Sequence, residues 1–205
     1  EYIERFVATL AATHAQARSL PLADLFGGIG GDVRITDGAD HVPAVLDEFI
    51  DSVGNRFPAK AIELVRRIRD SVPVVARLLS TEETLVHGDA HFGNAMYDAS
   101  GALLLDWALA VMGPGEVDLA HALAMNLPRL FSREYEAALL RTYAETRAAY
   151  GEDTTENEIL ERYRRCLLLT VIIAVGMRKV PGMAAQIWVY MFTNAVHTAL
   201  VNMYT

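Results

Sequence analysis

Residues 85–107, LVHGDAHFGNAMYDASGALLLDW, include polar side chains that can bind a metal ion or move a proton, among them His87, Asp89, His91, Asn94 and Asp106. The first three alternate along the chain, as transition-metal ligands often do. Asp89, Asn94 and Asp106 instead offer oxygen atoms, which suit a hard cation such as magnesium and its bound phosphates. The segment therefore allows two chemistries, metal-assisted hydrolysis and phosphoryl transfer.

The stretch between Asn94 and Asp106 has the pattern of a β-hairpin. The segments AMYD and ALLLD alternate or run apolar on either side of the turn residues ASG. A register centred on Ser100 places Asn94 opposite Asp106, and Asp89 lies on the loop that enters the same end. We therefore expect three oxygen-bearing side chains to converge there, as a magnesium site requires.

A metallohydrolase would use His87, Asp89 and His91 as transition-metal ligands. Such a site needs further ligands, and His121 is a candidate. However, His121 lies in an apolar helical stretch, where a buried structural histidine with satisfied hydrogen bonds is more common. The sequence contains neither H-E-x-x-H nor paired C-x-x-C motifs. The metallohydrolase remains an alternative, but it explains less of the segment.

Phosphoryl transfer accounts for more of these residues. Kinase catalytic loops have the form H-x-D with an asparagine five residues after the aspartate, which matches His87, Asp89 and Asn94. In such a loop the aspartate orients a hydroxyl group and accepts its proton. The asparagine and a later aspartate, here Asp106, hold magnesium against the nucleotide phosphates.

Three motifs in this order, HGDAHFGN, LLLDW and GPGEVDLA, closely resemble the aminoglycoside phosphotransferase and choline kinase family of the protein kinase-like superfamily. They cover residues 85–120, and the first helix, which ends ATLAATHAQ, resembles the start of that family's C-terminal lobe. The resemblance implies an α+β, mostly helical fold, the catalytic C-terminal lobe of a phosphotransferase, with a small β-hairpin that carries the active site. His91 fits the motif, but we assign it no chemical role.

The resemblance also carries over to individual residues. Asp89 matches the catalytic base, and Asn94 and Asp106 match the magnesium ligands. His87 and Asp118 match residues that support the catalytic loop. The implied cofactors are ATP, or another nucleoside triphosphate, and Mg²⁺, and the implied substrate is a small molecule with a hydroxyl group.

Helical periodicity and capping signals predict the elements that must position these residues. Helices are expected over residues 2–14, 43–53, 59–79, from about 116, 132–150, 155–179 and 184–203, with a strand over 84–86. Pro73 is expected to kink or divide its helix. Ser132 is expected to cap one helix, and Thr155 and Glu158 to form a capping box. We expect residues 1–205 to form a single domain.

Composition restricts the partners and the compartment. The formal net charge of −8 disfavours nucleic acid and anionic membrane surfaces as partners. The single cysteine, Cys166, excludes an intramolecular disulfide and favours a reducing, cytoplasmic compartment. It lies in an apolar run, where a buried thiol is more common than a nucleophile. That run is too short to cross a bilayer, and we expect no signal peptide before the first helix.

A kinase also needs a lobe that covers the nucleotide, with a glycine-rich turn and a lysine on a following strand. Residues 27–32, GGIGGD, are the only candidate for the turn, but they follow a helix and no strand lysine comes after them. Lys60 begins a helical pattern instead. We therefore expect an N-terminal lobe of the same parent chain to complete the enzyme. A non-catalytic kinase-like binding module is the other alternative, although the presence of Asp89, Asn94 and Asp106 together argues against it.

Overall fold

The computed structural model describes residues 1–21, 33–80, 84–98, 101–126 and 132–203. Its seven described α-helices are α1 Tyr2–Ala17, α3 Val42–Val53, α4 Ala59–Leu79, α5 Glu116–Asn126, α6 Arg133–Ala149, α7 Glu156–Met177 and α8 Ala185–Met203. Two short 3₁₀ turns, η1 Ala39–His41 and η2 Phe92–Asn94, complete the helical structure. The prediction of a mostly helical α+β fold is confirmed.

Local capping chemistry fixes two helix starts as the sequence predicts. The Ser132 hydroxyl accepts a hydrogen bond from the backbone N–H of Tyr135 at the start of α6. Thr155 and Glu158 form a reciprocal capping box at the start of α7. Pro73 does not divide its helix, because α4 continues through it to Leu79, and a kink at Pro73 stays a prediction.

Two small antiparallel sheets interrupt the helices. Strand β1, Thr84–Val86, pairs with β4, Val111–Gly113, and β2, Ala95–Tyr97, pairs with β3, Ala102–Leu104, in the predicted hairpin. The predicted hairpin register is wrong by one residue.

The hairpin ladder closes between Asp98 and Gly101 instead of being centred on Ser100. The backbone N–H of Asp98 donates to the carbonyl of Gly101 (3.1 Å), and the N–H of Gly101 donates to the Asp98 carboxylate (3.1 Å). Asn94 therefore lies opposite Leu105, whose N–H donates to the Asn94 carbonyl at 2.8 Å. A one-residue change in the turn shifts every pair in an antiparallel ladder.

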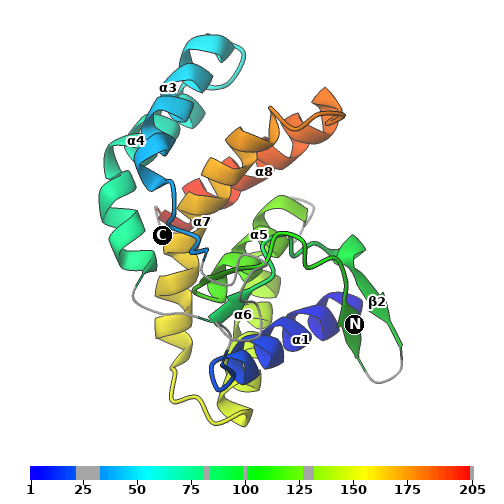
Figure 1. The fold of residues 1–205 in the computed structure, drawn as a ribbon. Helices are drawn as coiled ribbons and strands as arrows, with labels where there is room; N and C mark the ends of the chain where they lie inside the picture. The colour runs from blue at the N-terminus through cyan, green and yellow to red at the C-terminus, as the bar shows by residue number, and fades with distance from the viewer. Residues whose placement is uncertain (22–32, 81–83, 99–100, 127–131, 204–205) are drawn as a thin grey trace.

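Helix α5 lies at the centre of the molecule, between α1 and α6 on one side and the α3–α4 pair on the other (Figure 1). Every residue from Glu116 to Met125 is buried, because α5 packs against α7, α8 and α1. A helix covered on several sides must be apolar around most of its circumference. The polar residues that α5 does carry, Glu116, Asp118 and His121, are therefore exceptions that need an explanation.

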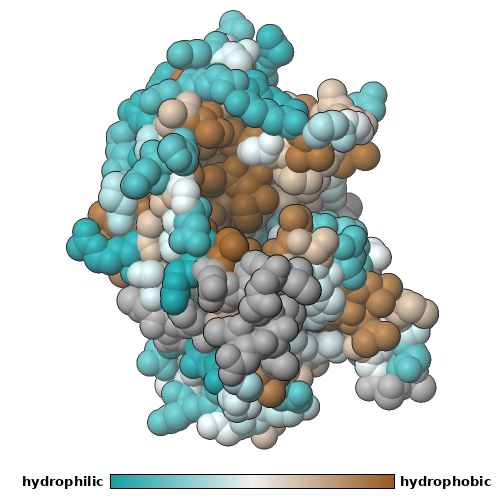
Figure 2. Space-filling view, viewed as in Figure 1, coloured by the Kyte–Doolittle hydropathy of each residue, from teal (hydrophilic) through white to brown (hydrophobic). Residues whose placement is uncertain are grey.

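The α3–α4 pair is joined to the rest of the molecule by aromatic packing. Phe49 and Phe57 contact Trp188 and Phe192 of α8, with ring centroids 4.9–6.2 Å apart. Beside this pair the surface is hollowed, and hydrophobic side chains line the depression (Figure 2). In the described part of the chain, no helix has both the length and the apolar character needed to cross a membrane.

Candidate active site

One buried carboxylate on α5 holds the loop between β1 and β2 by hydrogen bonds to its backbone. Asp118, on α5, is fully buried and accepts hydrogen bonds from the backbone N–H groups of His87 (2.6 Å) and Gly88 (3.0 Å). A carboxylate that accepts several N–H bonds has a strong preferred geometry. Asp118 thus fixes the start of the loop relative to the central helix.

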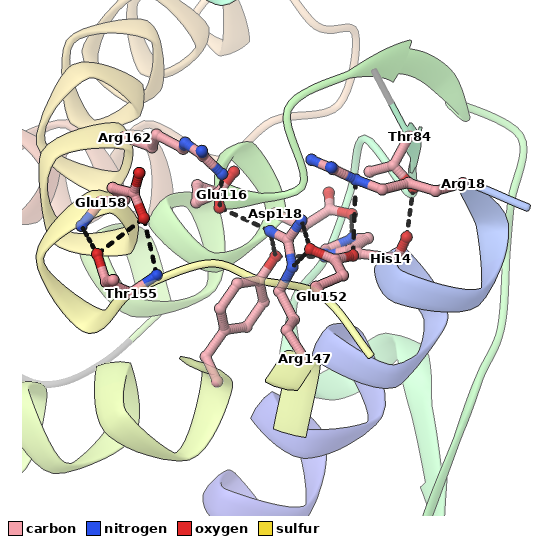
Figure 3. Close-up of polar contacts among 11 residues, drawn as sticks. His14, Arg18, Thr84, Glu116, Asp118, Arg147, Glu152, Thr155, Glu158 and Arg162 are labelled. Carbon is pink, nitrogen blue, oxygen red and sulfur yellow. Dashed lines mark hydrogen bonds and ion pairs between the residues drawn. The ribbon is translucent and has the colours of Figure 1, made fainter. Parts of the chain in front are cut away.

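A third hydrogen bond to Asp118 comes from His14 on α1. The imidazole Nε2 lies 3.0 Å from Asp118 Oδ2, and Nδ1 lies 2.7 Å from the hydroxyl of Tyr143 (Figure 3). Thr84 of β1 donates its hydroxyl to the His14 carbonyl at 2.7 Å. The sequence alone did not single out His14. The available signal was its position one turn after Leu10 on the apolar face of the first helix.

The donors and acceptors of the hydrogen bonds around His14 can be assigned consistently. Arg147 donates to the Tyr143 oxygen at 3.3 Å, so the Tyr143 hydroxyl is free to donate to His14 Nδ1, and His14 Nε2–H donates to Asp118. Burial raises the pKa of Tyr143, which keeps its hydroxyl protonated. The loop is therefore tied through α5 and α1 to α6.

Arg147 is itself fully buried and paired. It donates to Glu116 Oε1 (2.7 Å) and to Glu152 Oε2 (2.8 Å), as Figure 3 shows. Burial alone would lower the pKa of Arg147, but Tyr143 and the two carboxylates raise it above its ordinary value. Because Glu116 begins α5, this ion network fixes the N-terminus of the helix that carries Asp118.

Two glycines allow the chain to approach these groups closely. Gly88 has φ +82°, and a Cβ placed on it would lie 2.1 Å from the carbonyl oxygen of Leu109. A Cβ on Gly115 would lie 2.5 Å from His14 Nδ1 and 2.7 Å from the Tyr143 hydroxyl. Any larger residue at either position would displace the loop or the residues beneath it.

Both ring nitrogens of His87 are engaged within the protein. Nδ1 accepts from the N–H of Asp89 at 3.3 Å, and Nε2 donates to the carbonyl of Leu105 at 2.8 Å. The ring also packs against Trp107, with centroids 4.6 Å apart. His87 therefore links the loop to the end of the hairpin and has no nitrogen lone pair left for a metal ion.

The metallohydrolase alternative also uses His91 as a ligand. His91 Nδ1 accepts from the N–H of Gly93 at 3.1 Å. Its Nε2 lies 3.8 Å from Asp89 Oδ2. In the described part of the chain, no group of three or more His, Cys, Asp or Glu side chains is arranged to hold a metal ion.

Asn94 orients the carboxylate of Asp89. The Asn94 side-chain amide donates to the Asp89 carbonyl (3.0 Å) and to Asp89 Oδ2 (3.2 Å). Both bonds use the side-chain amide nitrogen of Asn94, so its side-chain oxygen, Oδ1, is the atom left for a cation. The Asp89 side chain is 33% exposed, which leaves it accessible to a substrate.

Asp106 lies at the same end of the hairpin as Asn94. It follows β3 and is one residue beyond Leu105, the residue opposite Asn94. Its side chain is exposed, and its φ of +60° is the only positive φ of a non-glycine residue in the described chain. A left-handed conformation at a non-glycine residue costs free energy and is often found at functional sites.

His121 differs from the structural histidine that the sequence suggested. Its Nε2 lies 3.6 Å from Asp89 Oδ1. Its Nδ1 is buried without a hydrogen-bond partner among the residues that the structure describes. The expectation that its hydrogen bonds are satisfied within an apolar helix is therefore wrong.

The remaining candidate residues are away from this loop or outside the described ranges. Cys166 is fully buried, and burial raises its thiol pKa well above the ordinary value, as expected for a thiol that is not a nucleophile. Lys60 lies in the first turn of α4, as its helical pattern predicts. The glycine-rich segment 27–32 lies outside the described residues.

Comparison with solved structures shows that known proteins share this fold. A protein of Ralstonia eutropha JMP134, provisionally assigned as an aminoglycoside phosphotransferase, matches 98% of this chain with a TM-score of 0.54 and 16% identity. The ADP-bound aminoglycoside phosphotransferase APH(2'')-Ib matches 98% of the chain with a TM-score of 0.52 and 13% identity. These likenesses describe the fold. The chain covers 63% and 66% of the two structures, less than two thirds of each.

Sequence comparison also finds similarity to phosphotransferases. Methylthioribose kinase of Bacillus pumilus (strain SAFR-032) is 31% identical over an alignment of 97 residues, which covers 44% of this chain and 24% of the kinase. A model of the phosphotransferase enzyme family, APH, matches residues 1–152, which include the whole loop, the hairpin and α5. On this match, the chain belongs to the phosphotransferase enzyme family.

Proposed function

We propose that this chain is the catalytic lobe of a small-molecule kinase that transfers the γ-phosphoryl group of ATP, or of another nucleoside triphosphate, to a substrate hydroxyl. The observation that carries the proposal is the pairing of Asp89 with Asn94. An accessible carboxylate is oriented by the amide of Asn94, on a loop whose backbone is held by Asp118. The exposed Asp106 follows the adjacent strand at the same end of the hairpin.

Asp89 is the proposed general base. Its carboxylate accepts a hydrogen bond from the substrate hydroxyl, which orients the oxygen. It takes the proton as the new O–P bond forms and the bond from the γ-phosphorus to the oxygen of the departing nucleoside diphosphate breaks. The hydrogen bonds from Asn94 and the backbone support restrict the carboxylate to one orientation. Positioning of this kind supplies much of the catalysis in phosphoryl transfer, because the protein does little covalent chemistry itself.

The donor set at Asn94 and Asp106 fits Mg²⁺. Their available atoms are a carbonyl oxygen and an exposed carboxylate, and Mg²⁺ is usually held by one or two such ligands together with substrate phosphates. A bound Mg²⁺ would neutralise charge on the phosphates during transfer. Asn94 and Asp106 are therefore the proposed metal ligands.

The acceptor and the second lobe are part of the proposal. The relatives named for their substrates are a methylthioribose kinase and an aminoglycoside phosphotransferase, and both kinds of compound carry hydroxyl groups. The net charge of −8 favours a neutral or cationic acceptor. We propose that an N-terminal lobe of the same parent chain covers the nucleotide and supplies the lysine. A cytoplasmic location fits both the ATP supply and the free thiol of Cys166.

The test uses the complete protein that contains this chain. Binding of MgATP is measured by calorimetry, and ADP release is followed with methylthioribose and with a panel of aminoglycosides. Asp89→Asn should lower kcat by about 10²–10⁴-fold with little change in MgATP affinity, because only the proton acceptor is removed. Asp106→Asn should weaken Mg²⁺-dependent nucleotide binding as well as turnover.

The exposed Asp51 on α3 provides the matched control, because Asp51→Asn makes the same chemical change far along the chain from the loop. It should leave both binding and turnover unchanged. A complete protein that binds no MgATP would refute the proposal. Near-normal turnover by Asp89→Asn in an active protein would refute the assignment of the base.

A further inference from the structure

His121 lies one helical turn after Asp118 on α5, so both side chains face the same side of the helix. That side faces the loop 87–94. Asp118 binds the backbone at the start of the loop, whereas His121 lies beside the Asp89 side chain, with Nε2 3.6 Å from Oδ1. A single helix thus contacts both the backbone and the reactive carboxylate of the loop.

The cost of burying His121 argues against a packing role. Its side chain is only 4% exposed, and its Nδ1 has no hydrogen-bond partner among the described residues. A buried polar atom without a partner costs free energy, which an apolar residue at the same position would avoid. Among the contacts that the structure describes, the only carboxylate beside the other ring nitrogen, Nε2, is that of Asp89. A role for a histidine at this position therefore depends on Nε2.

The electrostatic surroundings keep this imidazole neutral. Burial has the largest effect on the pKa of His121 and lowers it. The nearby carboxylates of Asp89 and Asp118 raise this pKa, whereas His91 and His87 lower it. The net direction is downward, so the ring carries one proton near neutral pH. That proton belongs on Nε2, because an Nε2 lone pair would face the lone pairs of Asp89 Oδ1.

We propose that His121 is a positioning residue for Asp89, and that its Nε2–H donates to Oδ1 while Asn94 donates to Oδ2. The inference rests on the proposed function, in which Asp89 accepts the substrate proton. At 3.6 Å the contact is longer than a hydrogen bond, as is common for catalytic contacts before substrate binds. Two donors on opposite oxygens fix the plane of the carboxylate and leave each oxygen a lone pair for the substrate.

His91 also approaches Asp89, but it is less suited to this role. Its Nε2 lies 3.8 Å from Oδ2, the oxygen that Asn94 already engages, and its side chain is 36% exposed. Solvent screens a contact of that kind. His121 acts from the buried side, on the oxygen that Asn94 does not reach.

The experiment compares His121→Leu with His121→Gln in the complete protein, using the acceptor that supports the fastest ADP release among methylthioribose and the aminoglycosides. The amide nitrogen of glutamine can occupy the place of imidazole Nε2, whereas leucine removes the donor. His121→Leu should lower kcat by about 10–100-fold with the KM for MgATP unchanged, as expected for a misplaced reacting group. His121→Gln should keep most of the activity. The exposed His197 on α8 supplies the control, His197→Leu, with no expected effect.

A double variant separates positioning from a general structural role. If His121 acts through Asp89, the Asp89→Asn/His121→Leu protein should have the same kcat as Asp89→Asn alone. Independent, multiplicative losses would overturn the inference, as would a normal kcat for His121→Leu. Those results leave the proposed function intact, provided that Asp89→Asn is slow. A fast Asp89→Asn protein would instead refute the proposed function itself.

A third variant guards against misfolding of the leucine protein. His121→Asn places its amide nitrogen near the Nδ1 position and cannot reach Asp89 in the same way. We expect it to lose activity while His121→Gln retains it, with similar melting temperatures for the two. Equal activity of the asparagine and glutamine variants would overturn the inference.

Discussion

Replacement of Asp118 by asparagine tests whether one buried carboxylate holds the loop between β1 and β2. Three donors converge on it: the N–H of His87 and the Nε2 of His14 on Oδ2, and the N–H of Gly88 on Oδ1. An asparagine side chain has one oxygen and one NH₂ group. In either orientation of the amide, at least one backbone N–H of the loop must face the NH₂ group.

The magnitude follows from these contacts. An orphaned buried donor costs about 1–3 kcal/mol, and each of the two remaining bonds loses about 1 kcal/mol of charge assistance. A neutral amide is easier to bury than a carboxylate, which offsets part of the loss. We expect Asp118→Asn to lower the free energy of unfolding by about 2–4 kcal/mol, or Tm by about 5–15 °C for a chain of this size.

The assay is thermal and urea unfolding of the complete protein, followed by circular dichroism. Asp51→Asn is again the matched control, because an exposed aspartate should change stability by less than about 0.5 kcal/mol. A Tm for Asp118→Asn within 1–2 °C of the control, roughly the effect of half a kcal/mol, would refute this account of the loop support.

Three further predictions concern the loop, its pH dependence and the isolated chain. Gly88→Ala should lower the free energy of unfolding by at least about 1–2 kcal/mol because of the positive φ alone, and the clash with Leu109 should lower it further. The control Gly176→Ala, in open surroundings on α7, should be neutral or stabilising. Equal stabilities of the two variants in urea would contradict this prediction. Because burial lowers the folded-state pKa of His121 below its ordinary value of 6.5, the unfolded chain binds more protons below that pH, so stability should fall as pH drops from 6.5 toward the folded-state pKa. His121→Gln should reduce this fall in Tm and His197→Gln should not; an identical pH profile for all three proteins would disprove it. Finally, the 205-residue chain, checked for helical content, should show negligible ATP turnover, and turnover at rates ordinary for kinases would show that no second lobe is needed.

The sequence by itself determined the features that depend on neighbours in the chain. Helix starts at Ser132 and Thr155 follow from caps that act within three residues. The hydrogen bonds between Asn94 and Asp89 lie within a single loop, and their five-residue spacing could be recognised directly. Asp118 was likewise identified from the sequence, because the motif around it resembles one in a family of known fold.

Only the tertiary structure decided which distant groups meet. His14 and Asp118 are separated by 104 residues, and their contact depends on how α1 packs beside α5. The hairpin register depended on the Asp98–Gly101 closure, which apolar alternation does not specify because a shift of one residue still leaves a plausible pattern. His121 looked like a core residue because its neighbours in sequence are apolar. Its place beside Asp89 is set by the packing of α5 under the loop, and periodicity reports which face of a helix is buried but not what covers it.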